Sequence, residues 1–170
     1  NCYNKILSAD SVYDIAIKTP TQSAPKLSSK LDNNIFIKRE DLQPVFSFKL
    51  RGAYNKISKL KNKKHIVAAS AGNHAQGVAM TCKKLKLESS IVMPLTTPTI
   101  KVNAVKKLGS KVILSGDTYD EAYSFAIKFA KDNNYEFVHP YDDLDVIAGQ
   151  GTIAIELIDQ LNEHPDYVFI

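Results

Sequence analysis

The sequence predicts an α/β protein with an open parallel sheet that is covered by helices on both faces. Short apolar runs near 66–69, 91–93, 112–114 and 137–138 alternate with stretches of helical periodicity. Strands that alternate with helices over short connections typically form a parallel sheet. With 170 residues, of which 44% are hydrophobic, the chain is long enough to bury a core.

The part of the chain before the first sheet strand is less regular. An amphipathic stretch at 12–16 is followed by prolines that break the chain, and a short helix is predicted at 26–31. Residues 35–37 form a short apolar run. We expect this run to be a buried strand.

A helix is predicted just after Pro44. Proline disfavours the α conformation in the residue before it, so the helix begins after Pro44 with Ser47 as its N-cap. From Leu50 onwards, apolar residues recur at spacings of three and four, which makes one buried face. This placement puts Lys49 in the first turn of the helix.

A lysine in that position is unusual, because the N-terminal end of a helix carries partial positive charge and favours acidic side chains. The helix dipole, together with Phe46 and Phe48, should penalise the ammonium form of Lys49 and lower its pKa. A lysine that is neutral part of the time can act as a nucleophile and form a Schiff base. The competing interpretation is an ordinary surface lysine.

The helices of the alternating region are predicted near 73–86, 99–108 and 118–132, and a final helix near 146–162. In this last helix, the Gly-x-Gly at 149–151 indicates close helix packing. The apolar run at 167–170 resembles a buried strand, and we expect the chain to be part of a longer protein.

The turn that follows the strand at 66–69 is a candidate ligand site, since open α/β sheets bind ligands beyond the carboxyl ends of their strands. Gly72 would permit an unusual backbone angle or the close approach of a ligand. The N–H groups at the start of the next helix suit a carboxylate or a phosphate. A plain strand-to-helix turn with Asn73 as the cap is the competing interpretation.

Residues 38–54 have the sequence KREDLQPVFSFKLRGAY. This stretch resembles the pyridoxal phosphate segment of the threonine dehydratases, also called threonine deaminases, which are tryptophan-synthase-β-like enzymes of fold type II. The resemblance implies that Lys49 binds pyridoxal 5'-phosphate covalently beside Phe48, and that Asn73 hydrogen-bonds to the 3′-oxygen of the cofactor. It also implies a loop that binds the substrate carboxylate, made of Ser70, Ala71, Gly72, Asn73 and His74.

The resemblance further implies the reaction, which is the deamination of L-threonine, or of L-serine, to a 2-oxo acid and ammonia. For threonine the product is 2-oxobutanoate, in the first step of isoleucine biosynthesis. Isoleucine would act as an allosteric effector through a C-terminal region outside this chain, and the protein would be a homotetramer or homodimer. The chain alone is expected to be inactive.

The same resemblance divides the chain unevenly. Residues 1–51 and 146–170 are expected to belong to a large pyridoxal phosphate domain that is truncated here. Residues 52–145 are expected to form a complete small α/β domain.

Three alternative functions remain open. A serine dehydratase or serine racemase of the same fold is the nearest, but serine racemases carry a second serine, acting as a base, where this chain has Ala71. A nucleotide-binding module is a second alternative, against which the absence of G-x-G-x-x-G after a strand argues. The third is a non-catalytic truncated α/β module that serves as an interaction partner.

Composition excludes several other classes. Cys2 and Cys82 lie far apart and match no metal-binding spacing, so neither a disulfide framework nor a metal site is predicted. The net charge of +4 is modest, and the lysines at 59–64 suit a helix C-terminus better than nucleic acid. No apolar run approaches the length of a membrane span. We expect a cytoplasmic protein, or a plastid one if a transit peptide precedes Asn1.

Overall fold

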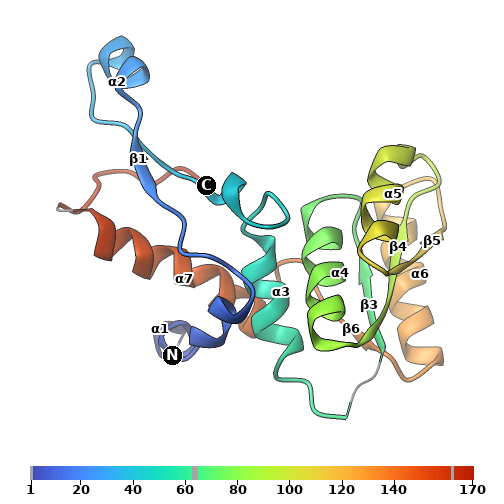
Figure 1. Cartoon of the computed structure of the whole chain (residues 1–170). Coiled ribbons are helices and arrows are strands. Elements are labelled where there is room, and N and C mark those ends of the chain that lie inside the picture. Colours follow the sequence, from blue (N-terminus) through green and yellow to red (C-terminus); the bar gives the residue numbers. More distant parts are fainter. Residues whose placement is uncertain (1, 63–64, 162) are drawn as a thin grey trace.

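The computed structural model describes residues 2–62, 65–161 and 163–170. Lys63 and Lys64 of the lysine run, and Asn162 at the end of the last predicted helix, lie outside the described residues. The main sheet contains four parallel strands in the order β5-β4-β3-β6. The strands are β3 (His65–Ala69), β4 (Glu88–Met93), β5 (Lys111–Leu114) and β6 (Glu136–Phe137). The predicted open parallel sheet is therefore confirmed (Figure 1).

Helices cover both faces of this sheet, as predicted. Helices α4 (Asn73–Leu85) and α5 (Thr99–Lys107) pack on one face, where Ile66, Ile91 and Val105 belong to a shared apolar cluster. Helix α6 (Tyr119–Asp132) packs on the other face through a row of alanines. The start of α6 is set by a capping box, in which the Thr118 hydroxyl accepts from the Glu121 N–H and the Glu121 carboxylate accepts from the Thr118 N–H.

Helix α3 (Lys49–Ile57) lies between α4 and the long helix α7 (Leu144–Gln160). Glycines permit this close packing, as predicted for the Gly-x-Gly of α7. A Cβ atom on Gly149 would lie only 2.6 Å from the carbonyl oxygen of Arg51, and one on Gly151 would lie 2.6 Å from Ile6 of α1 (Cys2–Leu7). A larger residue at Gly149 would force α3 and α7 apart, whereas one at Gly151 would displace the side chain of Ile6.

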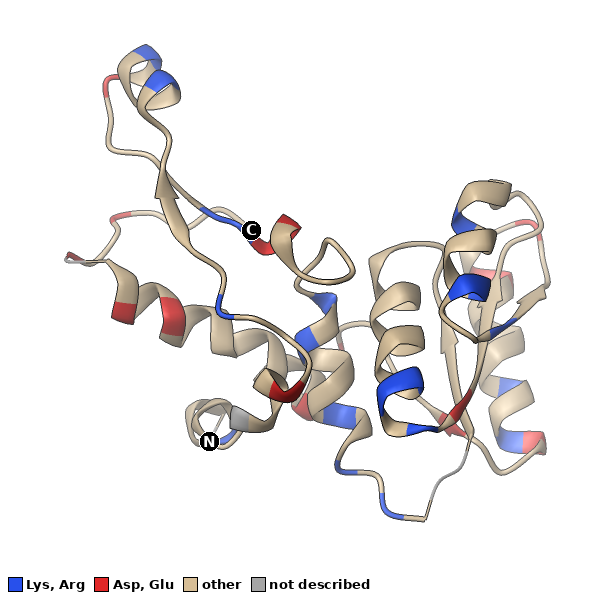
Figure 2. Cartoon of the chain, viewed as in Figure 1, with Lys and Arg blue, Asp and Glu red and all other residues tan. Residues whose placement is uncertain are grey.

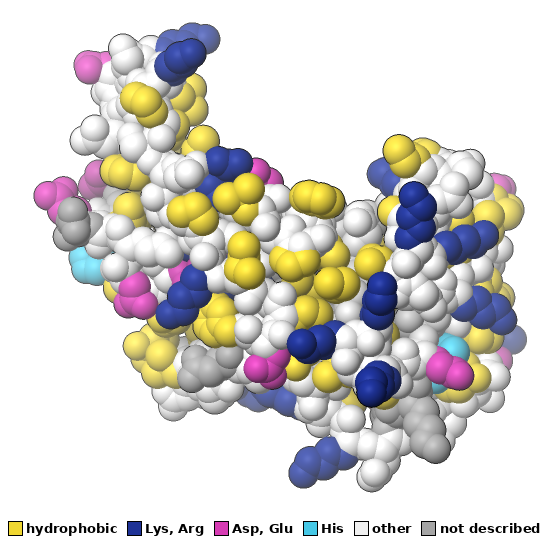
Figure 3. Space-filling view, viewed as in Figure 1, with side chains coloured by type: hydrophobic (Ala, Val, Ile, Leu, Met, Phe, Trp, Pro, Cys, Tyr) yellow, Lys and Arg dark blue, Asp and Glu magenta, His cyan; other side chains and the backbone are white. Residues whose placement is uncertain are grey.

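A separate two-stranded antiparallel ribbon extends from the N-terminal part of the chain, with α2 (Pro25–Leu31) at its tip (Figure 1). Its strands are β1 (Thr21–Ser23) and β2 (Phe36–Lys38), preceded by the 3-10 turn η1 (Asp10–Asp14) and followed by η2 (Glu40–Leu42). The strand predicted at 35–37 exists, but the prediction that it is buried is wrong. Phe36 and Ile37 are 53% and 47% exposed, because among the described strands β2 pairs only with β1. Figure 3 shows hydrophobic side chains on the surface of this ribbon.

The strand predicted at 167–170 is also absent. The structure has no regular element there, and Phe169 is 93% exposed. An apolar, β-prone run becomes a strand only where another strand pairs with it, and no described strand pairs with this segment. The boundary predicted between residues 51 and 52 falls inside α3, and the division into domains stays a prediction.

Cys2 is exposed and Cys82 is buried, and both are free. Within the described part of the chain, no helix combines the length and the apolar character that crossing a membrane requires. In the same residues, no cluster of three or more His, Cys, Asp or Glu side chains could hold a metal ion.

Candidate functional site

Lys49 is the first residue of α3, which places it in the first turn as predicted. Since α3 begins at Lys49, Phe48 and not Ser47 stands at the N-cap position, although its backbone angles (φ −62°, ψ −18°) are already helical. Ser47 still contributes, since its hydroxyl oxygen accepts a hydrogen bond of 3.2 Å from the Lys49 N–H. No side-chain hydrogen bond caps the helix at Phe48 itself.

The amine of Lys49 is half-buried, and Nζ donates a hydrogen bond of 2.9 Å to the carbonyl oxygen of Pro140. Burial lowers the pKa of Lys49, which confirms the predicted direction. Of the two phenylalanines that were expected to contribute to this lowering, only Phe48 lies near the amine. The Phe48 ring centroid lies 5.3 Å from Nζ, whereas Phe46 is 77% exposed and does not cover the amine.

The predicted loop at 70–74 joins β3 to α4. Ser70 accepts a hydrogen bond of 3.1 Å from the N–H of Gly72 through its hydroxyl oxygen. Gly72, and not Asn73, is the N-cap of α4, and the side chain of Asn73 is exposed. The φ of Gly72 is −132°, so it does not use the left-handed region that favours glycine, and the close approach of a ligand remains the predicted reason for a glycine here. A Cβ atom at Gly72 would face open space, which leaves room for a ligand to approach.

The N-terminus of α4 has the features of an anion site. It carries no side-chain cap and no acidic residue in its first turn. The N–H groups of the first turn therefore keep their partial positive charge, and they can donate to a carboxylate or phosphate.

His74 has a structural role. Its ring is buried, and Nε2 lies 3.1 Å from the carbonyl oxygen of Val138, so Nε2 carries the proton and donates it. Burial, together with the proximity of Lys49, lowers the pKa of His74 to about 4. A histidine with this pKa is neutral at physiological pH, so proton transfer by His74 is not expected.

The depressed pKa of His74 predicts a pH-dependent stability. Between about pH 6.5 and 4 the unfolded chain binds a proton that the folded chain does not, so the free energy of unfolding should fall as the pH falls. The total loss should be on the order of 3 kcal/mol. Urea unfolding across this range should show a smaller slope for His74→Gln, which keeps a donor for Val138. The exposed His164→Gln is the control; equal slopes in the two variants would contradict the prediction.

The segment that follows β6 joins Lys49 to the α4 loop. The carbonyl oxygen of Val138 accepts from His74, and that of Pro140 accepts from Lys49. Gly77 brings α4 close to the same place, since a Cβ atom there would lie 3.0 Å from the carbonyl oxygen of Lys49. No sequence pattern indicated a role in the site for Val138, Pro140 or Gly77. The one signal for the first two was their position at the carboxyl end of a predicted strand.

These elements together make one site. The half-buried amine of Lys49 can bind an aldehyde, and the uncapped start of α4 can hold an anionic group. The site lies at the carboxyl ends of β3 and β6, where ligands bind in open α/β sheets.

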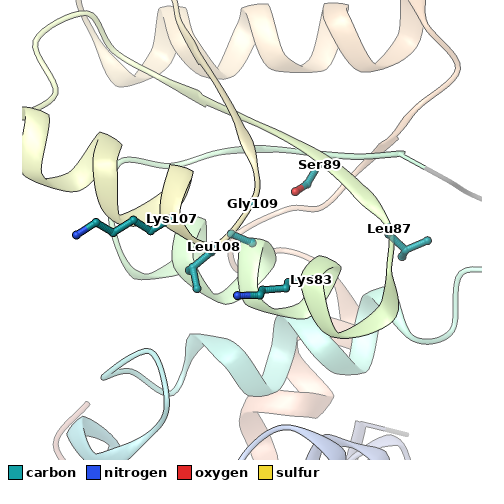
Figure 4. A pocket seen from close by; sticks show the side chains of 7 residues that line it. Lys83, Leu87, Ser89, Lys107, Leu108 and Gly109 are labelled. Carbon is teal, nitrogen blue, oxygen red and sulfur yellow. The ribbon is translucent and has the colours of Figure 1, made fainter.

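A separate cavity of about 250 Å³ lies at the opposite, amino end of β4 (Figure 4). Lys83 and Lys107 line it, from the last turns of α4 and α5. Lysines are favoured at helix C-termini, where the carbonyl groups carry partial negative charge. The two lysines therefore need no ligand to explain them, and this cavity is not part of the Lys49 site.

The sequence matches the family described as "Pyridoxal-phosphate dependent enzyme" over residues 12–170. Among curated proteins, it is 51% identical to "Threonine dehydratase 1 biosynthetic, chloroplastic" of Solanum lycopersicum over 162 residues, which are 94% of the chain and 27% of that protein. It is also 51% identical to "L-threonine dehydratase biosynthetic IlvA" of Pasteurella multocida, with 99% of the chain and 33% of that protein covered.

Solved structures are similar over nearly the whole chain. The processed form of threonine deaminase isoform 2 from Solanum lycopersicum matches with a TM-score of 0.89 and 47% identity, covering 95% of this chain and 46% of that one. Maize serine racemase matches with a TM-score of 0.89 and 30% identity, covering 94% and 50%. The chain thus spans about a quarter to a third of the length of the two curated relatives, and about half of each solved chain.

Proposed function

The chain belongs to the pyridoxal-phosphate dependent enzyme family, and on that premise we propose that the whole protein deaminates L-threonine to 2-oxobutanoate and ammonia, the first step of isoleucine biosynthesis. The observation that carries this proposal is the half-buried Lys49 amine, whose pKa is lowered and which lies close enough to His74, in the first turn of α4, to lower the pKa of that ring. The similarity to proteins named threonine dehydratase supports threonine as the substrate.

The residues of the site fit pyridoxal phosphate. Lys49 would hold its aldehyde through Nζ, whose pKa is lowered by burial. Phe48 lies beside that amine, and the exposed Asn73 side chain would hydrogen-bond to the 3′-oxygen. Gly72 leaves open space where a larger residue would place a side chain.

The substrate-binding role is assigned to the loop before α4. The N–H groups at the start of α4 would orient the carboxylate of threonine. Ser70 would hold the loop in shape, because its hydroxyl oxygen accepts from the N–H of Gly72. His74 would anchor α4 to the segment after β6 through Val138.

Lys49 would then act as the base. Its neutral amine at Nζ would take the proton from Cα of threonine, after which the β-hydroxyl group leaves. The cofactor, when bound, supplies an electron sink for the charge that develops on Cα. A lowered pKa helps Lys49 twice, because the same neutral amine serves as nucleophile and as base.

Elimination is favoured over racemisation by Ala71. A racemase needs a second base on the far face of the cofactor, and the methyl group of Ala71 can neither take nor give a proton. His74 is buried and neutral, and its Nε2–H group is hydrogen-bonded to the carbonyl oxygen of Val138. Neither residue can return a proton to Cα.

Steady-state kinetics of the full-length protein test this proposal. We expect a higher kcat/KM for L-threonine than for L-serine, with 2-oxobutanoate as the product and no D-serine formed from L-serine. Ala71→Ser is the matched variant, and we expect any D-serine to appear only there. Formation of D-serine by the unmodified protein, or a preference for L-serine, would contradict the threonine dehydratase assignment.

Further properties of the whole protein are proposed on the resemblance to threonine dehydratases. Isoleucine would be an allosteric effector that acts through a region outside this chain, and the protein would be a homotetramer or a homodimer. It would work in the cytoplasm, or in a plastid. Residues 52–145 would form its small domain, and 1–51 with 146–170 would belong to the large one.

A further inference from the structure

A cluster of buried charges lies between α3, the β2–η2 segment and α7. It contains two cations, Lys38 and Arg51, and two carboxylates, Glu40 and Glu156, so their formal charges cancel. The side chain of Arg51 is fully buried and that of Glu156 is 2% exposed. Figure 2 shows basic residues on α3 and acidic residues on α7, two helices that pack against each other. Buried charges persist only when they are paired in this way.

The guanidinium group of Arg51 is the centre of this cluster. Nε and Nη2 donate to the Glu40 carboxylate at 2.9 and 2.7 Å. Nη1 donates to Glu156 at 2.6 Å and to the Thr152 hydroxyl at 3.0 Å. Nη2 also donates to the carbonyl oxygen of Ile17 at 3.2 Å. All the N–H donors of the guanidinium are used, and they connect α3 to three separate segments.

Glu156 is the second junction of the cluster. Besides Arg51, it accepts a hydrogen bond of 2.7 Å from the hydroxyl of Tyr13 and is paired with Lys38 at 2.6 Å. Burial alone would raise the pKa of Glu156, but the hydrogen bonds from Arg51, Lys38 and Tyr13 outweigh it and hold the pKa below its usual value. Glu156 therefore stays ionised and keeps its partners.

The cluster and the Lys49 amine lie on different sides of α3. Lys49 and Arg51 are two positions apart, which turns their side chains by about 200° around the helix axis. Accordingly, Lys49 reaches Pro140 beyond β6, whereas Arg51 reaches α7 and η2. A slip of α3 by one residue would turn the helix by about 100° and move it by about 1.5 Å.

Toward its C-terminal end α3 is held by other directional contacts, since the Asn55 amide donates to the carbonyl oxygen of Asp145 at 2.7 Å and Lys56 is paired with Asp143 at 2.8 Å. The first turn, which carries Lys49, has fewer such contacts. The helix start has no side-chain cap at Phe48. Glycines form its closest contacts on both sides, with Gly77 of α4 against Lys49 and Gly149 of α7 against the backbone of Arg51. Glycine contacts bring backbones close together but offer no side chain that interlocks. Hydrogen bonds are directional, so near the first turn the charge cluster supplies a restraint that these glycine contacts lack.

We propose that the buried cluster of Lys38, Glu40, Arg51 and Glu156 is a positioning device that fixes the rotation and axial position of α3, and so places the amine of Lys49. The role assigned to Lys49 rests on the proposed function. Arg51 is a positioning residue, since it acts through the helix that carries Lys49.

Arg51→Lys in the full-length protein tests this proposal, because it keeps the charge and loses the planar fork of donors. Arg39→Lys is the matched control: Arg39 also pairs bidentately with a carboxylate, that of Asp41, but this pair is exposed and does not contact α3. Tyr13→Phe is a milder variant that removes one hydrogen bond to Glu156. Each is measured for thermal unfolding, for kcat/KM, for the Kd of pyridoxal phosphate, and for the pKa of Lys49.

The pKa of Lys49 is read from the pH dependence of its acetylation in cofactor-free protein, by peptide mass mapping with Lys59 as an internal reference. In Arg51→Lys we expect this pKa to rise towards the ordinary lysine value, because a displaced amine becomes solvated. We expect kcat/KM to fall on the order of 10- to 100-fold, as misplacement of a reacting group by about 1 Å can produce, and the Kd of pyridoxal phosphate to rise. Tyr13→Phe should shift the same quantities less, and Arg39→Lys should leave them unchanged.

The positioning role is overturned if Arg51→Lys lowers the unfolding temperature but leaves the Lys49 pKa and the cofactor Kd unchanged. Should Arg51→Lys fail to fold, the same two quantities in Tyr13→Phe decide, and unchanged values overturn the proposal. If the proposed function itself is wrong, pyridoxal phosphate will not bind Lys49 in the unmodified protein either. That result differs from the two outcomes for the variants, and it would overturn the positioning role as well.

Discussion

Lys49→Ala in the full-length protein should lower kcat for threonine deamination by about 10⁴-fold or more, while the fold is kept. The variant removes the nucleophile that holds the cofactor and the base that takes the α-proton, and a single positioned acid or base already contributes about 10²- to 10⁴-fold. The fold should survive because the Lys49 side chain is half-buried and makes one hydrogen bond, to Pro140. Kinetics and circular dichroism of the purified variant check both expectations.

Borohydride reduction after incubation with pyridoxal phosphate, followed by peptide mass mapping, identifies the lysine directly. We expect a pyridoxyl adduct at Lys49 in the full-length protein and none in the 170-residue chain alone. The matched control is Lys59→Ala, which removes an exposed lysine paired with Asp145 and should keep full activity. An active Lys49→Ala variant, or an adduct at another lysine, would refute the assignment.

Glu156→Gln should destabilise the protein by about 3 kcal/mol or more, the cost of breaking a buried ion pair from one side. The amide has nearly the shape of the carboxylate but no charge, so Arg51 would keep only the Glu40 carboxylate and Lys38 would lose its ion pair with Glu156. Urea unfolding measures the loss. The control is Asp41→Asn, which breaks the exposed pair with Arg39 and should cost less than about 1 kcal/mol. Equal losses in both variants would contradict this account.

Glu156→Gln should also change how the free energy of unfolding depends on pH below neutrality. The pKa of Glu156 is lower in the folded chain than in the unfolded one, so its contribution is complete above the ordinary glutamate pKa and is lost as the pH falls through the lower, folded value. Unfolding free energies measured from neutral pH downwards should therefore decline less steeply in Glu156→Gln. An unchanged decline would show that Glu156 does not bind its proton more weakly in the folded state.

Much of the fold could be predicted from local sequence. The four strands of the parallel sheet and the helices α3 to α7 were expected within a few residues of their observed bounds. The periodicity of apolar residues carries this information, because each element has one face or both faces against the core. The first turn of α3 was also placed correctly, since Pro44 limits where a helix can begin.

The errors have a common cause. The runs at 35–37 and 167–170 are as apolar as the core strands, yet Ile37 and Phe169 are exposed. Apolar character shows that a segment can be buried, but a neighbouring element must cover it. The cover comes from parts of the chain distant in sequence, which local patterns do not identify.

The sequence by itself determined the α/β architecture, the identity of Lys49 as the candidate nucleophile, and the loop 70–74 as the candidate anion site. Only the tertiary structure decided what these residues contact: Pro140 lies 91 positions from Lys49, and Glu156 lies 105 positions from Arg51. Periodicity and capping preferences act over a few residues, because they arise from contacts along one helix or strand. The placement of a reactive amine and the pairing of buried charges arise when elements pack, and they depend on the whole fold.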